Sequence, residues 1–388
     1  MDNPRITKIE WGVLTGQRPR NAGSNARLGD HGRTVRVPIA RITTEDGVSG
    51  FGVCRATSQQ AAKLVGKPIA TFFSPTEGAT TIGQPFDYPL WDWAGKQTGQ
   101  PVYQLAAAMT DKVVHGALRV PCYDTSLYID DLHLATDEEA AQLIAEEAQA
   151  GLAQGHQAFK IKVGRGARHL PLEQGTQRDI AVIRAVRAAV GAGATIMLDA
   201  NNGYNLNLTK RVLAETAACN IFWMEEAFHE DRSLYLDLQA WLKAQDLPIL
   251  IADGEGQASP TLLDWAQEGV VNVVQYDIFG YGFTPWLKLG QQLDAWGVRS
   301  APHHYGGHYG NYAACHLAGA IRHFAYVEWD EATTPGLDAS DYAIEAGQVL
   351  VPDAPGFGLT LDEKIFQNAV AMDGFAHAIE DLDADKRR

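Results

Sequence analysis

Short apolar runs that end in an acidic residue recur at a regular spacing through the middle of this chain. Three of them end at Asp199, Glu225 and Glu255, at intervals of 26 and 30 residues (225 − 199, 255 − 225). Helical patterns separate the runs, and this alternation is typical of parallel βα units. The carboxyl ends of parallel barrel strands meet at one mouth, so the spacing predicts a barrel with acidic side chains gathered there.

Eight runs of this kind follow one another from about residue 119 onward. They predict strands at residues 119–123, 158–163, 195–199, 221–225, 249–252, 271–277, 298–302 and 324–329. Eight parallel strands with intervening helices close one (β/α)8 barrel, also called a TIM barrel. We therefore expect an α/β fold of this type.

Several expected helices begin at recognisable capping residues. Thr136 and Glu139 form the pattern of a capping box before an alanine-rich segment. Ser259 and Thr284 are each followed by proline, which predicts an N-cap and then a proline in the first helical position. These signals predict where three of the barrel helices start.

The two ends of the chain have a different character from the barrel segment. Residues 1–118 show alternating patterns of antiparallel strands followed by a helical stretch, and residues 349–388 form a polar tail rich in Pro and Gly with a short apolar run. We expect both parts to form an α+β capping domain over the mouth of a barrel built from residues 119–348.

One segment of the expected capping domain, residues 16–33, is rich in Gly and Asn and contains Arg18 and Arg20. Loops of this length in a compact domain are usually functional or disordered. Two interpretations stay open. The segment is either a mobile lid whose arginines contact substrate or a solvated loop.

The charge of the chain excludes some classes of partner. Its 388 residues carry a formal net charge of −15 and have a pI near 5.2. Nucleic-acid backbones and anionic membrane surfaces both require a basic face, so we expect neither partner. An anionic substrate would need a metal ion or a few arginines.

The cysteines and the start of the chain predict a cytoplasmic location. The four cysteines, Cys54, Cys122, Cys219 and Cys315, are far apart in sequence and form no CxxC pair, which favours buried or free thiols over disulfides. The N-terminus lacks the pattern of a signal peptide, and no stretch of 18 uninterrupted apolar residues occurs. We expect a soluble cytoplasmic protein.

Lys160 and Lys162 lie two residues apart in the second expected strand, and strand alternation directs both into the barrel. Mutual repulsion and desolvation lower the pKa of neighbouring ammonium groups, which favours a lysine that can accept a proton. The alternative is that both lysines pair with interior carboxylates for purely structural reasons.

The same alternation directs Asp199 and Glu225 inward, and Glu255 follows the next strand. Three carboxylates at one level repel one another unless a cation joins them, and a site made of oxygen atoms suits Mg²⁺ or Mn²⁺. The alternative is that each acid caps a following helix or pairs with a lysine. Such a structural role is common for one acidic residue but not for three that end successive strands.

Acid/base groups are also expected on the other side of the mouth. Asp277 ends the sixth run, and His303 or His304 follows the seventh. A carboxylate bonded to an imidazole fixes its tautomer and raises its basicity. Only one of the two histidines can face inward, and we expect it to be His303. Glu328 on the eighth run is either a protonated hydrogen-bond donor or a member of an interior ion pair.

These residues occur in motifs that resemble the enolase superfamily, and within it the mandelate racemase-like subgroup. A cap segment at residues 90–105 shares the resemblance, which covers nearly the whole chain. The barrel motifs occur in the family's order: Lys160-Ile161-Lys162, Leu198-Asp199-Ala200-Asn201, Trp223-Met224-Glu225-Glu226, Gly254-Glu255, Asp277 and Pro302-His303.

The resemblance implies roles for these residues. Asp199, Glu225 and Glu255 would bind Mg²⁺, Lys162 would be the base on one face, and His303 with Asp277 would be the acid/base on the other. Asn201 would help to hold the substrate carboxylate, and Lys160 would add to the positive electrostatic potential of the site. Glu328 would be an electrophilic acid. With Arg18 and Arg20, Tyr305 is a candidate for substrate contact, because polar side chains near it suggest a hydroxylated ligand.

The activity that the resemblance implies is removal of the proton beside a carboxylate, through an enediolate stabilised by the metal. The substrate is expected to be a small-molecule carboxylate, and the favoured reaction is dehydration of a sugar acid or related hydroxy acid to a 2-keto acid. Racemisation, epimerisation and cycloisomerisation are the alternatives. A metal-dependent acid-binding protein without catalysis and a metal-dependent hydrolase are rivals. The family also suggests a symmetric homo-oligomer.

Overall fold

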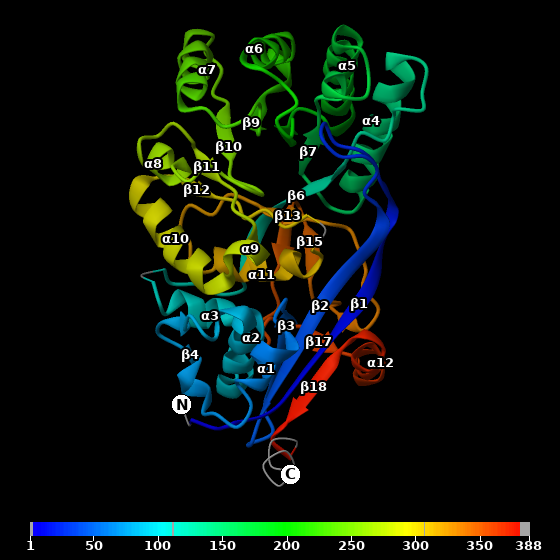
Figure 1. Ribbon diagram of the computed structural model, residues 1–388. Helices are drawn as coiled ribbons and strands as arrows, with labels where there is room; N and C mark the ends of the chain where they lie inside the picture. The colour runs from blue at the N-terminus through cyan, green and yellow to red at the C-terminus, as the bar shows by residue number, and fades with distance from the viewer. Residues whose placement is uncertain (1–2, 111, 306, 381–388) are drawn as a thin grey trace.

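A parallel sheet of eight strands forms the centre of the upper part of the molecule in Figure 1. The computed structural model describes residues 3–110, 112–305 and 307–380. The strands are β6 (Arg119–Leu127), β7 (Ala158–Lys162), β8 (Thr195–Asp199), β9 (Ile221–Glu225), β10 (Leu250–Asp253), β11 (Val273–Val274), β12 (Arg299–Ser300) and β13 (Val327–Trp329).

The parallel strands pair in the order in which they occur in the chain, from β6 to β12. At the other edge, β13 pairs with β6, and a parallel bridge between Ser300 and Phe324 joins β12 to the segment just before β13. The two edges of the sheet are thus brought together. The predicted α/β fold class is confirmed.

Helices cover the outside of these strands (Figure 1). They are α4 (Asp137–Ala153), α5 (Leu172–Val190), α6 (Leu206–Glu215), α7 (Arg232–Ala244), α8 (Leu262–Gln267), α9 (Ile278–Tyr281), α10 (Phe283–Trp296) and α11 (Tyr309–Ala318). Short 3-10 helices lie at Ile69–Thr71, Gln84–Phe86, Arg165–Ala167 and Ala217–Cys219. Among the described residues, no helix is both long and apolar enough to cross a membrane.

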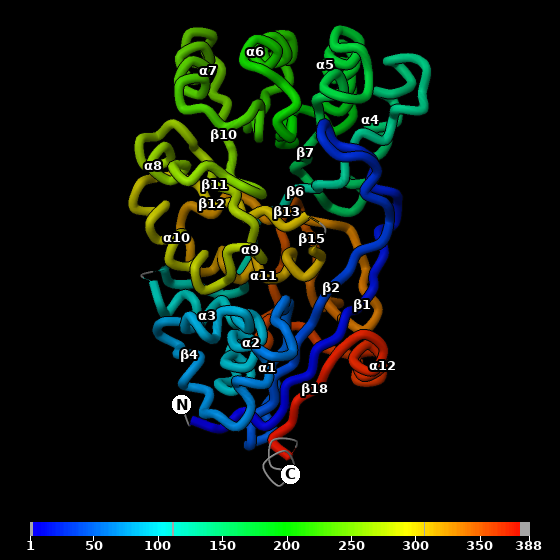
Figure 2. Tube along the Cα trace, viewed as in Figure 1, coloured from blue at the N-terminus to red at the C-terminus, as the bar shows by residue number. Residues whose placement is uncertain are grey.

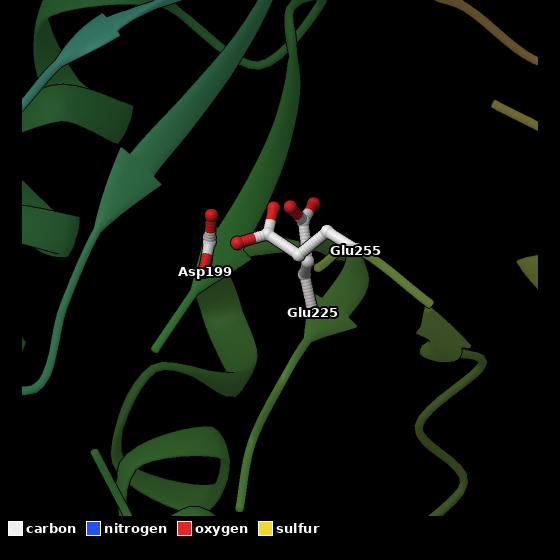
Figure 3. A group of neighbouring side chains, drawn as sticks. All are labelled: Asp199, Glu225 and Glu255. Carbon is white, nitrogen blue, oxygen red and sulfur yellow. The ribbon is translucent and has the colours of Figure 1, made fainter. Parts of the chain in front are cut away.

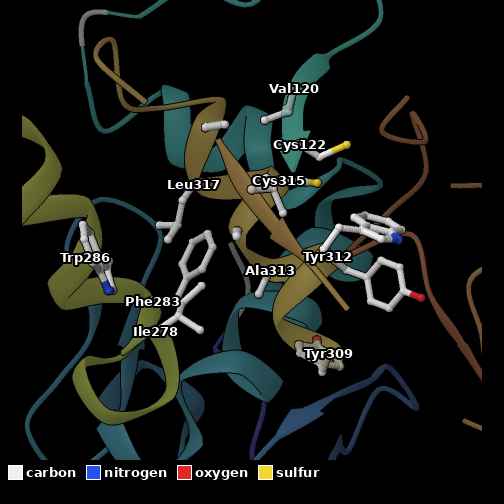
Figure 4. Close-up of a cluster of buried hydrophobic side chains, with 14 of the residues drawn as sticks. Val120, Cys122, Ile278, Phe283, Trp286, Tyr309, Tyr312, Ala313, Cys315 and Leu317 are labelled. Atoms are coloured by element: carbon white, nitrogen blue, oxygen red, sulfur yellow. The ribbon is translucent and has the colours of Figure 1, made fainter. Parts of the chain in front are cut away.

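Two apolar layers flank the strands. Inward-facing Met197, Trp223 and Val273 belong to a small cluster inside the sheet, and each precedes a polar inward residue by two positions. The outer layer fills the space between strands and helices, and Figure 4 shows the part of it where Phe283 of α10 and Leu317 of α11 lie. The four cysteines are buried and free, as the sequence predicts. Burial of these faces follows the two-residue period of the strands.

The lower part of the molecule contains a four-stranded antiparallel sheet of order β18-β1-β2-β3. Its strands are β1 (Ile6–Ala22), β2 (Gly32–Thr44), β3 (Ser49–Val53) and β18 (Phe375–Ala378), and its helices are α1 (Ser58–Ala62), α2 (Asp87–Thr98), α3 (Val102–Ala107) and α12 (Glu363–Asp373). A Cβ atom at Gly50 would lie 2.2 Å from the backbone nitrogen of Trp93, so glycine there lets β3 approach α2 closely.

Short strands complete the fold. They are β4 (Phe73–Ser74), β5 (Gly78–Ala79), β14 (Leu337–Asp338), β15 (Ala343–Glu345), β16 (Gln348–Leu350) and β17 (Thr360–Leu361). β16 pairs antiparallel with β6, whereas β18 pairs with β1. The tail after residue 349 therefore contacts both the barrel strands and the cap sheet, and the predicted three-part division of the chain stays a prediction.

The expected loop at residues 16–33 is only partly correct, because residues 16–22 belong to β1 and residues 32–33 to β2, whereas residues 23–31 lie outside the strands. β1 and β2 form one long hairpin that rises from the cap sheet to the mouth beside α4 (Figure 2). Gln17 N donates to Thr333 O at 2.8 Å and Ser24 N to Ile129 O at 3.2 Å, so the hairpin is tied to the barrel by its backbone. Strand pairing and these contacts satisfy backbone groups that an isolated loop would leave to water.

Helix starts were predicted with mixed success. The capping box of Thr136 and Glu139 begins α4, which confirms that prediction. The N-caps predicted at Ser259 and Thr284 are wrong, because Thr261 caps α8 and α10 begins at Phe283. The Thr284 hydroxyl instead donates to Asp87 Oδ1 at 2.6 Å, so a contact between helices takes the place of the cap.

Candidate active site

Three carboxylates converge at the carboxyl ends of neighbouring strands (Figure 3). Asp199 and Glu225 end β8 and β9 and lie directly opposite each other in the strand register, and Glu255 follows β10 by two residues. One oxygen from each lies within 4.8 Å of the others. The parallel register of the strands brings the three acids to one level.

Polar neighbours fix the orientation of these carboxylates. Trp223 Nε1 and Gln275 Nε2 donate to Glu225 Oε2 at 3.0 and 2.9 Å. Asn201 donates through its backbone to Asp199 Oδ1 at 2.9 Å and through its side chain to Glu255 Oε1 at 3.1 Å. These donors hold the acids at defined positions, and within the cluster Glu255 Oε2 has no hydrogen-bond partner among the described residues.

The donor set fits a divalent cation of the Mg²⁺ type. All three groups offer oxygen, which hard cations prefer, and no described Cys or His joins the group. Burial and the nearby charge of Asp199 raise the pKa of Glu225 above its ordinary value. The Oδ1 atom of Asn201 is also buried and has no hydrogen-bond partner among the described residues. A bound cation would relieve the repulsion between the acids.

Both predicted lysines face this cluster. Lys160 Nζ lies 2.7 Å from Glu225 Oε1 and 3.2 Å from Glu328 Oε1, and Lys162 Nζ donates to Asp199 Oδ2. The expected lowering of their pKa values is wrong for the protein without a bound cation. Burial favours lowering, but the facing carboxylates outweigh it and raise the pKa of both lysines.

His303 lies across the cluster from the lysines. Its Nδ1 is 2.5 Å from Asp277 Oδ1, and its Nε2 is 3.1 Å from Glu255 Oε2. Burial would lower the pKa of His303, but Glu255, Glu328 and Asp277 raise it to about 10. The neighbouring His304 is buried and contacts Glu328 O at 2.5 Å. Of the two adjacent histidines, His303 is the one that meets the three-carboxylate cluster.

Glu328 has the surroundings of an ionised carboxylate. It accepts hydrogen bonds from Thr125 Oγ1 at 2.7 Å, His304 N at 2.8 Å and Tyr305 N at 3.1 Å, and it pairs with Lys160. Burial raises its pKa, but Lys160 and the histidines lower it well below the ordinary value. These contacts favour the interior ion pair over the protonated donor.

Arg18 and Arg20 already have partners within the protein, whereas the buried Tyr305 hydroxyl has no hydrogen-bond partner among the described residues. Arg18 binds both carboxylate oxygens of Asp330, at 3.0 and 2.7 Å, and its guanidinium lies 4.5 Å from the centre of the Tyr305 ring. Arg20 Nη1 lies 2.5 Å from Glu147 Oε2, on α4 outside the strands. The role of all three in substrate binding stays a prediction, and the two guanidinium groups form fixed ties between the hairpin and the barrel.

Two cavities contain residues of the candidate site. One of about 510 Å³ is lined in part by Asn201 and Glu255. The other, of about 280 Å³, is lined by Asp277 and His303 together with residues of the cap. The larger cavity therefore reaches the carboxylate cluster at Glu255, and the smaller one reaches the His303–Asp277 pair.

Sequence reasoning missed several residues of the site. Gln275 and Thr125 were missed although each lies two residues along its strand from an inward residue, so strand alternation was a sufficient signal. Arg36 and Arg55, which line the smaller cavity, belong to the cap and gave no such signal. Only the packing of the cap on the barrel brings them to the site.

Comparison with known proteins agrees with this geometry. The family model described as enolase C-terminal domain-like matches residues 143–365, more than half of the chain. The chain therefore belongs to the enolase superfamily, and its relatives are of the mandelate racemase-like type.

Relatives at two levels of similarity are informative. A crystal structure of galacturonate dehydratase from Geobacillus sp., in complex with D-galacturonate and 5-keto-4-deoxy-D-galacturonate, is 47% identical and has a TM-score of 0.93, covering 97% of this chain and 100% of that one. Arabinonate dehydratase of Saccharolobus solfataricus is 27% identical, with 90% of this chain and 94% of that protein aligned. D-galactarolactone cycloisomerase of Agrobacterium fabrum is also 27% identical, over 71% of this chain and 70% of that protein.

Proposed function

We propose that this protein is a Mg²⁺-dependent dehydratase of a sugar acid, with a hexuronic acid as the leading candidate. The reaction would remove the proton on the carbon beside the carboxylate and expel the hydroxyl on the next carbon, which gives a 2-keto acid. The observation that carries the proposal is the convergence of Asp199, Glu225 and Glu255 between Lys162 and the His303–Asp277 pair. The 47% identical galacturonate dehydratase supports the substrate class.

The three carboxylates would hold the cation, and Mn²⁺ is an alternative to Mg²⁺ for an oxygen site of this kind. When bound, the cation would stabilise the negative charge that develops on the substrate carboxylate. Asn201 has an unpartnered Oδ1 atom that can accept a hydrogen bond from a substrate hydroxyl.

Lys162 and His303 would divide the proton transfers between them. Lys162 contacts Asp199, whereas His303 contacts Glu255, so the two groups approach the cluster from different sides. In the proposed reaction Lys162 takes the proton beside the carboxylate, and His303 gives a proton to the departing hydroxyl. Asp277 binds Nδ1 of His303 and leaves Nε2 for the substrate.

Lys160 and Glu328 would act as supports. Lys160 contacts Glu225 and Glu328 and is 1% exposed, so it would add positive charge beside the carboxylates. Glu328 holds Lys160 on one side and the backbone of His304 on the other. This pair would keep the acid/base residues at a fixed separation.

Racemisation, epimerisation or cycloisomerisation is the second candidate. The observation that favours it is the same two-sided placement, because His303 could return a proton to carbon from the face opposite Lys162. The cycloisomerase among the relatives supports this reading. The product decides between the candidates, since dehydration alone yields a keto acid.

The proposal also includes the compartment, the partner and the oligomeric state of the protein. The buried free cysteines support a reducing compartment such as the cytoplasm. The net charge of −15 supports a small-molecule acid, rather than nucleic acid or a membrane, as the partner. A symmetric homo-oligomer is expected from the family.

Hydrogen exchange tests the proposed function. The protein is incubated with Mg²⁺ and a panel of sugar acids in deuterated water, and NMR follows both deuterium beside the carboxylate and the keto acid. We expect a keto acid from at least one hexuronic acid, and inverted substrate without keto acid would support the second candidate. Failure to exchange with every acid of a broad panel would favour a protein that only binds acids, and hydrolytic products would favour a hydrolase.

A further inference from the structure

Two arginines of the cap line the same cavity as the candidate acid/base pair. Arg36 lies in β2, and Arg55 follows β3 by two residues. β2 and β3 pair with Ile39 opposite Val53, so Arg36 and Arg55 lie on neighbouring segments of one sheet. Both line the cavity of about 280 Å³ that also contains His303 and Asp277.

Neither guanidinium is used to hold the fold together. Within residues 3–110, 112–305 and 307–380, Arg36 and Arg55 form no hydrogen bond or ion pair through their side chains. Buried arginines of the same chain do form ion pairs: Arg18 pairs with Asp330, and Arg165 pairs with Asp131 and Asp179. Arg36 and Arg55 are exposed, and their charges are free to meet a ligand in the cavity that His303 also lines.

The other cavity residues differ between the cap side and the barrel side. On the cap side Val37, Pro38 and Val53 line the cavity, and their side chains offer a ligand no hydrogen bonds. On the barrel side His304 and Tyr305 line it, and His304 Nδ1 and the Tyr305 hydroxyl have no hydrogen-bond partner among the described residues. Asp277 is occupied, because its oxygens accept hydrogen bonds from His303 Nδ1 at 2.5 Å and Gly256 N at 2.9 Å. The cap side of the cavity therefore presents donors from Arg36 and Arg55 against an apolar wall.

The chemistry of the guanidinium group restricts what can lie there. Arginine has five N–H donors and no acceptor, so its best complement is a group that only accepts hydrogen bonds. A carboxylate or an aldehyde carbonyl meets this condition. A terminal alcohol meets it less well, because its own hydrogen finds no acceptor on a guanidinium or on an apolar wall.

We propose that Arg36 and Arg55 form a subsite for the end of the substrate that is far from the reacting carboxylate, and that they select acids whose far end carries acceptor oxygens. Such acids are the uronic acids, whose open-chain form ends in an aldehyde, and the aldaric acids, with a second carboxylate. Aldonic acids, which end in a primary alcohol, would be poor substrates. This inference rests on the proposed function, and it assigns the choice between substrates with different far ends to two residues of the cap.

The test compares three six-carbon acids that share their configuration next to the reacting carboxylate and differ only at the far carbon: a hexonate, a hexuronate and a hexarate. The variants are Arg36→Met and Arg55→Met, which keep length and lose charge. Arg232→Met is the matched control, because Arg232 is an exposed arginine whose partner, Glu268, lies outside both cavities.

Each cavity substitution is expected to lower kcat/KM for the preferred acid by about 10- to 100-fold, as for loss of a hydrogen bond to a charged group, mainly through KM. The hexonate should be a poor substrate of the unaltered protein and should change little in the variants. A preference for the hexarate identifies a carboxylate as the natural occupant, and a preference for the hexuronate identifies the aldehyde or ring oxygens. Equal loss for all three acids would indicate a structural role and overturn the proposal.

Binding measurements separate this inference from the proposed function. Calorimetric titration of Lys162→Ala protein with the same acids and Mg²⁺ reports the subsite without turnover. If no acid reacts with the unaltered protein but binding of the uronate or aldarate depends on Arg36 and Arg55, the subsite stands and the dehydratase proposal fails. If an acid is dehydrated and the arginine variants have the same kcat/KM for all three acids as the unaltered protein, the subsite is wrong and the dehydratase proposal stands.

Discussion

At the scale of single residues, Lys162 and His303 contact different carboxylates of one cluster, so their removal should have different effects. Lys162→Ala should abolish both deuterium exchange and dehydration, because the base is lost. His303→Asn should lower dehydration by about 10²- to 10⁴-fold, the usual contribution of a general acid, and leave exchange largely intact. NMR in deuterated water measures both. Loss of exchange in His303→Asn would show that the histidine, rather than the lysine, removes the proton.

A buried histidine outside the site should control how stability depends on pH. His156 Nε2 lies 2.5 Å from Glu331 Oε1. Burial lowers the pKa of His156, but contacts with Cys122 and Glu331 and the charge of Asp124 raise it to about 10 from an ordinary 6.5. A raised histidine pKa stabilises the fold fully below pH 6.5, and this contribution is lost as the pH rises through 10.

We therefore expect the free energy of unfolding to fall by roughly 2–4 kcal/mol between pH 6.5 and pH 10, and His156→Gln to remove most of this dependence. Urea unfolding at several pH values measures it. His323→Gln is the control, because His323 is exposed. Parallel curves for the unaltered protein and His156→Gln would contradict the assignment.

Sequence analysis correctly predicted the positions of those candidate site residues whose direction follows from strand alternation. The two inward lysines and the acids at strand ends were found because a parallel strand fixes the direction of every second side chain. The sign of the lysine pKa shifts was wrong, because repulsion between two ammonium groups was weighed without the carboxylates that face them. Charge balance depends on several strands at once, so one strand does not reveal it.

At the scale of elements, the hairpin of β1 and β2 is anchored at the mouth by an ion pair. Arg18 and Asp330 are both buried and share two hydrogen bonds. Asp330→Ala should lower the free energy of unfolding by about 3–5 kcal/mol, because a buried guanidinium is left unpaired. Activity should also fall, since the hairpin carries Arg36 to the cavity.

The double variant Arg18→Met with Asp330→Ala should be more stable than Asp330→Ala alone, since no unpaired charge remains. Urea unfolding of the two single variants and the double variant gives the coupling between the residues. Arg211→Met, which removes an exposed surface pair with Glu173, should leave stability nearly unchanged, because solvent screens that pair. Additive effects of Arg18 and Asp330 would show that the pair does not anchor the hairpin.

The elements that were predicted correctly have local signals, and those that were missed do not. Thr136 caps α4 through atoms three residues away, so the sequence contains the whole motif. The upper half of the hairpin depends on distant backbone groups such as those of Thr333 and Ile129. A segment rich in Gly and Asn looks like a loop until these partners are known.

At the scale of the whole molecule, a cation in the carboxylate cluster should stabilise the fold, because it joins three strands. At a Mg²⁺ concentration about 100 times its Kd, binding adds about 2.7 kcal/mol to the free energy of unfolding. Thermal unfolding in Mg²⁺ and in a chelator measures this difference. Glu225→Gln should abolish it, whereas Glu173→Gln on the surface should preserve it. An undiminished Mg²⁺ effect in Glu225→Gln would place the cation elsewhere.

The cap sheet combines the first strand of the chain with one of its last, because β18 pairs with β1 over Lys8↔Ala378 to Trp11↔Phe375. During translation, β1 leaves the ribosome long before residues 375–378 do, so one edge of it has no partner until those residues have been made. The parallel strands can meet earlier. A chain that lacks residues 375–378 would therefore keep the three-carboxylate cluster but expose an open sheet edge available for aggregation.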